Sequence, residues 1–447
     1  MTPSEHPPQA VLDMPAARGA HAAPQAPASA TFALTALAGF IAYIASLAVL
    51  ALYRPFADDA VSGAMFVVGV TTAAIFAVDL VWYRVWRRAT TGLDLRASDA
   101  SVSRTAVKYV GLVASVALVG LAYWLFPEYR DPKYAPYFEL LRRTVVPWLV
   151  LAIPYFYLID GRMREPHDGY WHLGMAVLLK WDRVDRAVLV QHLLGWTIKG
   201  FFLALMVTFF CGDLRWLSLI DFGAMSSFRL LYDFLYRGVY LVDVGIATLG
   251  YVMAFRITDT HLRSAEPTML GWLVAIVCYE PFWSVIDRSY LPYGTGHPWG
   301  AWLAMHSTLY AVWGTGILIL SAIYVWATVS FGARFSNLTH RGIITSGPYR
   351  YTKHPAYLAK NLSWWMISVP FLPRGTLTDT VARCAMLLLV NLIYFMRART
   401  EEWHLSRDPT YVAYALWIER RGVLRFIRRI PLLRFAGYRP PLAPTVA

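Results

Sequence analysis

Two short segments near the end of this 447-residue chain concentrate residues that can do chemistry. The later one reads FMRARTEEWHLSRDPTYVAY from residue 395, with Arg397 and Glu401 four residues apart on one helical face. A cation and a carboxylate are thereby presented together. The same pair also fits two simpler interpretations, an intrahelical ion pair and a topology signal at the end of an apolar span.

The earlier segment, residues 331–357, reads FGARFSNLTHRGIITSGPYRYTKHPAY and forms a polar, glycine-containing loop between two apolar runs. Gly347 and Pro348 predict a turn. Pro355 suits the first turn of the next helix and holds the preceding His354 out of the helical conformation. The sequence therefore fixes His354 at a helix start, in a loop of the kind that often binds ligands.

The rest of the chain must place these two segments at a membrane. Of all residues 57% are hydrophobic and only 15% are charged, which is too apolar for a soluble domain of this size. Apolar runs of about 20 residues, each long enough to cross a bilayer, recur along the chain. Candidate spans are residues 31–53, 62–83, 105–126, 144–160, 189–211, 235–255, 268–286 and 305–330, then a tighter pair at 355–372 and 380–396. We expect an all-α, polytopic transmembrane helical bundle of about ten spans.

The net charge of +13 is concentrated in short segments between apolar runs, where basic residues set topology and meet lipid headgroups. We therefore expect no nucleic-acid partner. The distribution of Lys and Arg favours a cytoplasmic location for both termini. We expect a multi-pass protein of a bacterial-type inner membrane. Residues 415–435 mix apolar residues with many arginines, which predicts an interfacial C-terminal helix or, alternatively, a basic cytoplasmic tail. The three cysteines lack metal-ligand spacing, so no metal is expected.

The predicted organisation has four parts. Residues 1–30 form a disordered cytoplasmic tail, and residues 31–300 form an N-terminal transmembrane region of about seven spans. Residues 301–418 contain both polar segments and form the catalytic region. Residues 419–447 form a basic interfacial or cytoplasmic tail.

The order of these features is similar to a known family. A loop reading GPYRYTKHPAY, an apolar hairpin, RxxxEExxL and then Tyr411 together resemble the isoprenylcysteine carboxyl methyltransferase family and its phospholipid-methylating relatives, over residues 331 to about 418. The resemblance implies a membrane-embedded methyltransferase that uses S-adenosylmethionine (SAM) and needs no metal. It also implies that a lipid or lipid-linked acceptor enters from the bilayer.

The resemblance assigns roles by position. Glu401 would hold the ammonium group of SAM, and Arg397 would be the catalytic residue that binds the acidic group of the acceptor. The remaining cofactor-binding residues would be Arg341, Gly342, Ile343, Ile344, Tyr349, His354, Pro355, Ala356 and Tyr357. Glu280, in an apolar run beside Pro281, is a further candidate for substrate binding.

The acceptor stays open between two chemistries. A carboxylate is already nucleophilic at neutral pH and needs only orientation by Arg397, whereas an amine must lose a proton, for which Glu402 or His404 could serve as base. The leading expectation is O-methylation of a carboxylate. Alternatives are a phospholipid or amine N-methyltransferase, an NADPH-dependent sterol-type membrane reductase, and a non-catalytic transport or scaffold protein. The sequence indicates no oligomeric state.

Overall fold

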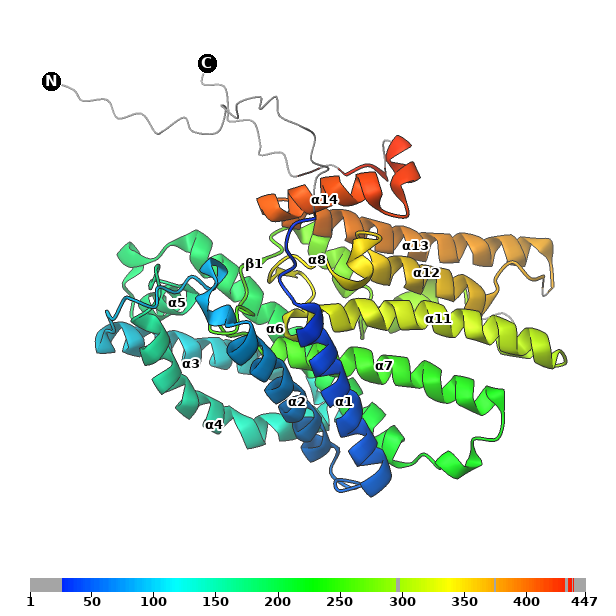
Figure 1. The fold of residues 1–447 in the computed structure, drawn as a ribbon, viewed down its shortest axis with the longest axis horizontal. Helices are drawn as coiled ribbons and strands as arrows, with labels where there is room; N and C mark the ends of the chain where they lie inside the picture. Colours follow the sequence, from blue (N-terminus) through cyan, green and yellow to red (C-terminus); the bar gives the residue numbers. More distant parts are fainter. Residues whose placement is uncertain (1–25, 295–297, 374, 431–432, 436, 438–447) are drawn as a thin grey trace, which may run out of the picture.

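The computed structural model describes residues 26–294, 298–373, 375–430, 433–435 and 437, and this part of the chain is a bundle of helices (Figure 1). Its only strands are β1 (Ser264–Ala265) and β2 (Thr339–His340), which pair antiparallel. The prediction of an all-α, polytopic membrane bundle is confirmed.

Seven helices in the described ranges are long and apolar enough to cross a membrane, and each corresponds to a predicted span. They are α1 (Ala33–Tyr53), α2 (Ala60–Phe76, extended to Trp82), α3 (Val102–Leu125), α4 (Ala135–Asp160), α6 (Arg186–Ser218), α11 (Ser307–Phe331) and α13 (Leu377–Leu405). The chain is thus an integral membrane protein.

The other three of the ten predicted spans are not among these seven helices. Helix α7 (Phe228–Val252) is long but carries more polar residues. The run 268–286 is broken into α8 (Met269–Ile276) and α9 (Phe282–Val285), because Pro281 has no N–H to continue a helix. The 14 residues of α12 (Pro355–Ser368) extend about 21 Å, less than the hydrocarbon thickness of about 30 Å.

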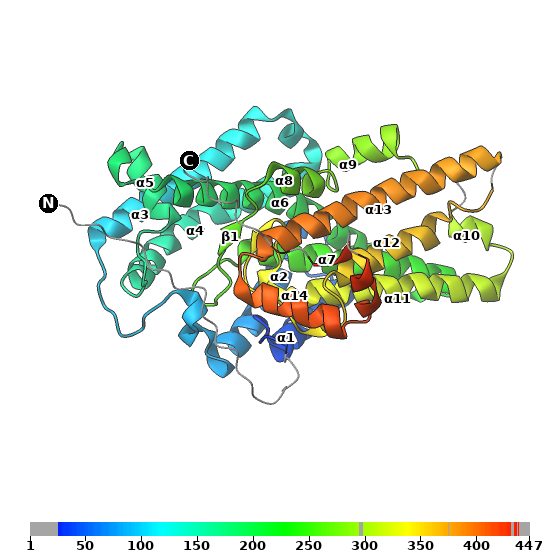
Figure 2. The ribbon, with the colours of Figure 1, turned by 90° about the horizontal axis from the view of Figure 1, so that it is seen from above.

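Helix α6 lies at the centre of the bundle. It packs against α2, α3, α4, α5 (Gly169–Val177) and α7, and its buried Phe202, Leu205 and Phe210 belong to the largest apolar core. Beyond α6 the chain continues as neighbouring helices α7, α11, α12 and α13, visible as a row in Figures 1 and 2. The ends of α11 and α13 and the start of α12 come together beneath α14 (Pro409–Arg421).

The loop between α11 and α12 follows the predicted pattern. Gly347 adopts a φ of +60°, and a β-carbon there would collide with the hydroxyl of Ser330. His354 precedes α12, whose first residue is Pro355. Helix α13 begins with a capping box between Thr376 and Asp379 and continues nine residues beyond the predicted end at 396. This extension is polar and carries the second candidate segment.

A buried charge network ties the loop after α7 to the end of α11. Asp259 is 1% exposed. It forms ion pairs with Arg334 and Arg263, each at 3.2 Å, and with Arg88 at 3.6 Å. Burial opposes ionisation of Asp259, but the arginine charges outweigh it and hold its pKa below its usual range.

The two terminal regions are described in part. Of the predicted tail 1–30, the first 25 residues lie outside the described residues. Ala30 donates its N–H to the carbonyl of Ile343 at 2.8 Å, so the segment just before α1 lies against the loop. The helix predicted at 415–435 begins earlier, at Pro409, and ends at Arg421. Its buried face packs on Ile343 through Tyr411 and Tyr414.

Candidate active site

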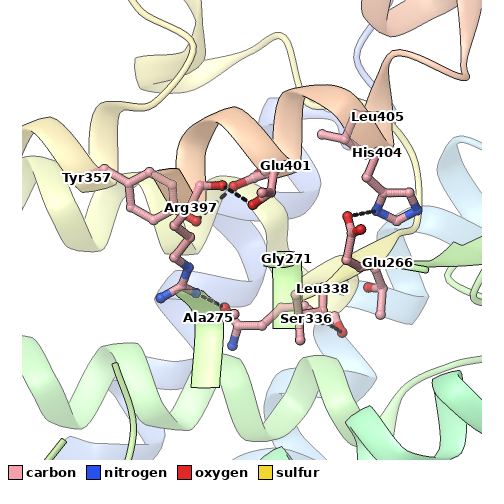
Figure 3. A pocket seen from close by; sticks show the side chains of 13 residues that line it. Glu266, Gly271, Ala275, Ser336, Leu338, Tyr357, Arg397, Glu401, His404 and Leu405 are labelled. Carbon is pink, nitrogen blue, oxygen red and sulfur yellow. Dashed lines mark hydrogen bonds and ion pairs between the residues drawn. The ribbon is translucent and has the colours of Figure 1, made fainter. Parts of the chain in front are cut away.

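A recess opens where α12, α13, the loop before β2 and the segment from β1 to α8 meet (Figure 3). Its lining comes from α13 with Arg397, Thr400, Glu401, His404 and Leu405, from α12 with Tyr357, from the loop and β2 with Ser336, Asn337, Leu338 and Thr339, and from the β1–α8 segment with Glu266, Gly271 and Ala275. The two segments singled out in the sequence therefore share one recess.

Arg397 is held at one end of this recess by polar and aromatic neighbours. Its guanidinium donates to Oδ1 of Asn337 at 2.6 Å and to the hydroxyl of Tyr279 at 3.3 Å. The rings of Tyr279, Tyr357 and Tyr394 lie 5.3–5.9 Å from it. The residue is 8% exposed, and within the described chain no carboxylate reaches it at ion-pair distance. A buried guanidinium without an anion is suited to binding one from a ligand.

Glu401 lies one helical turn beyond Arg397 and does not pair with it. Its Oε2 accepts a hydrogen bond from the hydroxyl of Tyr357 at 2.8 Å. No Lys, Arg or His side chain of the described ranges forms an ion pair with Glu401. The simple intrahelical ion pair is therefore not what this structure contains, and both charges remain available to a ligand.

The neighbouring Glu402, in contrast, is buried among basic side chains. It is 3% exposed and contacts Lys353 at 2.8 Å, Arg399 at 2.9 Å and Nε2 of His354 at 3.1 Å. It is absent from the lining of the recess. Glu402 thus anchors the loop to α13, and its partners leave it poorly placed to act as a base.

Of the predicted residues around the start of α12, Tyr357 lines the recess, whereas Tyr349, His354, Pro355 and Ala356 do not. His354 stacks on the ring of Tyr357, with centroids 5.5 Å apart and planes 9° apart, and so supports a lining residue. The carbonyl of Tyr349 accepts from the hydroxyl of Tyr414 at 2.7 Å. Burial, and next the charge of Glu401, raise the pKa of Tyr349 well above its usual range. Pro355 and Ala356 form the first turn of α12 but do not line the recess. Their contact with a cofactor stays a prediction.

The stretch Arg341–Ile344 also lies away from the recess. The guanidinium of Arg341 is buried and donates to the carbonyls of Gly250 at 2.6 Å and Thr260 at 2.7 Å, so it joins the loop to the end of α7. Burial, together with the charge of Arg334, lowers the pKa of Arg341 to about 9. None of the residues Arg341, Gly342, Ile343 and Ile344 lines this recess, and their contact with a cofactor stays a prediction.

Glu280 accepts a hydrogen bond from Ser284 at 2.6 Å and does not line the recess. Its neighbour Tyr279 contacts Arg397 instead. Two lining residues, Asn337 and Glu266, were not predicted from the sequence. Asn337 belongs to the polar loop that was expected to bind ligands, so its position gave some indication of a role. Glu266 lies outside both candidate segments and had no such indication.

Comparison with known proteins identifies the family of the C-terminal part. Residues 311–417 match the model of the isoprenylcysteine carboxyl methyltransferase (ICMT) family. This range contains Tyr357, Arg397 and Glu401, and the resemblance inferred from the two segments is confirmed. No curated protein and no solved structure matches the chain. Residues 311–417, the family domain, are therefore the part of this integral membrane protein that is similar to the isoprenylcysteine carboxyl methyltransferase family.

Proposed function

We propose that the recess binds SAM and transfers its methyl group to the carboxylate of a lipid or lipid-linked acceptor. The observation that carries the proposal is the pair of unneutralised charges, Arg397 and Glu401, in one recess within the family domain. A methyl ester would be the product.

The residues present fit the chemistry of SAM. Its ammonium group needs a carboxylate, which Glu401 offers with one oxygen fixed by Tyr357. The ring of Tyr357 also lines the recess, where an aromatic face can meet a sulfonium cation. Asn337, Leu338 and Thr339 of the loop line the same recess.

SAM supplies the electrophilic methyl group. Arg397 would hold the acceptor carboxylate in line with it, and Asn337 and Tyr279 fix the guanidinium in one orientation. Orientation and exclusion of water account for most of the rate acceleration in such a displacement. No general base is needed, because the acceptor is already ionised at neutral pH.

Incubation of the purified protein with methyl-labelled SAM and a membrane lipid extract tests the proposal. Label should enter the lipid fraction and be released as methanol by mild alkali, as for a methyl ester. Glu401→Gln should lose most of this transfer, while Glu165→Gln, an exposed carboxylate outside the recess, should retain it. Label that resists alkali would point to N-methylation, and absence of SAM binding would refute the methyltransferase proposal.

A further inference from the structure

One wall of the recess comes from outside the family domain. Glu266, Gly271 and Ala275 belong to the segment from β1 to α8, which precedes residue 311. Pairing of β1 with β2 fixes this segment to the domain, because Glu266 donates its N–H to the carbonyl of Leu338 at 2.8 Å. The N-terminal region thus contributes a carboxylate to the proposed active site.

The local structure holds this carboxylate in one position. Its backbone carbonyl accepts from the indole of Trp272 at 2.8 Å, and Oε1 accepts from the N–H and the hydroxyl of Thr268. The side chain lies against Gly271, where a β-carbon would come within 2.5 Å of its Cγ. Such preorganisation by neighbouring residues is typical of ligand-binding groups.

The second oxygen of Glu266 faces the recess without a hydrogen bond from the described residues. It lies 3.7 Å from Nδ1 of His404, which is beyond hydrogen-bond distance, while Nε2 of His404 lies 2.9 Å from the hydroxyl of Ser264. Glu266 is 3% exposed. A carboxylate oxygen that lines a recess and accepts no hydrogen bond from the protein can accept one from a ligand.

The charges of the recess indicate what that ligand must carry. In the proposed complex, Glu401 binds the ammonium of SAM and Arg397 binds the acid group of the acceptor. This arrangement leaves Glu266 with His404, at 3.7 Å, as its one ion-pair contact among the described residues, and without a Lys or Arg partner. Glu266 and His404 lie at one end of the recess and Arg397 at the other (Figure 3), so a second group on the same acceptor can reach them.

We propose that Glu266 binds a protonated amine of the methyl acceptor. The acceptor is then a lipid-linked molecule with two polar groups, an acid bound by Arg397 and an amine bound by Glu266. This inference rests on the proposed function and narrows its substrate class. It also gives the N-terminal region a role in substrate choice.

Blocking the amines of the substrate tests this inference without altering the protein. A membrane lipid extract is divided, and one half is treated with an amine-acylating reagent. The parent protein should transfer label from methyl-labelled SAM to the acylated half about tenfold less than to the untreated half, the factor expected for loss of one charge-assisted hydrogen bond.

The matched variant is Glu266→Gln in the full chain, with Glu165→Gln, an exposed carboxylate outside the recess, as control. Glu266→Gln should lower transfer to the untreated extract about tenfold, leave the Kd for SAM within about twofold, and no longer distinguish the two halves. Equal transfer to both halves by the parent protein would overturn the inference while leaving the proposed function intact. A Glu266→Gln variant whose weakened binding is confined to SAM would assign Glu266 to the cofactor and also overturn it. A parent protein that does not bind SAM would overturn both.

Discussion

Glu401 lines the recess without an ion pair to the described residues, whereas the adjacent Glu402 is buried among basic side chains. We therefore expect Glu402→Gln to lose stability and Glu401→Gln to lose affinity for SAM. Glu402→Gln removes a buried charge that contacts Lys353, His354 and Arg399. Breaking a buried ion pair costs about 3–5 kcal/mol. Since an amide retains one acceptor oxygen, we expect a loss near the lower end, about 3 kcal/mol of unfolding free energy.

Glu401→Gln should leave stability nearly unchanged. Its one hydrogen bond in the described structure comes from Tyr357, and an amide oxygen can accept it equally well. The cost should fall on ligand binding. Hydrogen bonds to charged groups contribute about 1.5–3 kcal/mol, so the Kd for SAM should rise about 10- to 150-fold.

The assay is thermal unfolding of both detergent-solubilised variants, paired with calorimetric titration of SAM. Glu165→Gln, which changes an exposed carboxylate outside the recess, is the control and should resemble the parent protein in both measurements. The reasoning fails if Glu401→Gln unfolds as early as Glu402→Gln while binding SAM normally, or if Glu402→Gln keeps the parent unfolding temperature.

Three further predictions concern single residues. Asn337→Ala frees the guanidinium of Arg397, so steady-state kinetics should show kcat/KM for the acceptor about tenfold lower with an unchanged Kd for SAM. Asp259→Asn leaves Arg334 buried without its anion, and chemical unfolding should show a loss of about 3–5 kcal/mol. The folded pKa of Asp259 lies below its unfolded value, so its contribution is present above about pH 4 and is lost as the pH falls through the folded pKa; an Asn variant should show a weaker acid-dependent loss of stability. Gly347→Ala forces a side chain into a left-handed position against Ser330, and the unfolding free energy should fall by about 1 kcal/mol or more.

The membrane helices could be predicted because an apolar run of sufficient length is a strong signal in itself. The end of α13 was missed, since charged residues from Arg397 onward end the apolar pattern while backbone hydrogen bonding continues to Leu405. The break in 268–286 was missed for the opposite reason. Glu280 is the only charged residue in that run, and Pro281 is the one residue in it that interrupts helical hydrogen bonding.

The centre of the candidate site could be predicted from local spacing. Arg397 and Glu401 share a helical face, and Tyr357 lies two residues after the proline that starts α12. Glu266 could not be predicted, because it reaches the recess through a strand pair of only two residues on each side, too short to leave a pattern. Asn337 belonged to the singled-out loop, but its bond to Arg397 depends on how the loop folds.

Photochemical cross-linking of methyl-labelled SAM, followed by peptide mapping, locates the SAM site on the protein. We predict label on the peptides that line the recess, around Ser336–Thr339, Tyr357 or Arg397–Leu405, and competition by unlabelled SAM should abolish it. Competable label confined to peptides away from this recess, or no competable label at all, would contradict the assignment of the SAM site to Arg397 and Glu401.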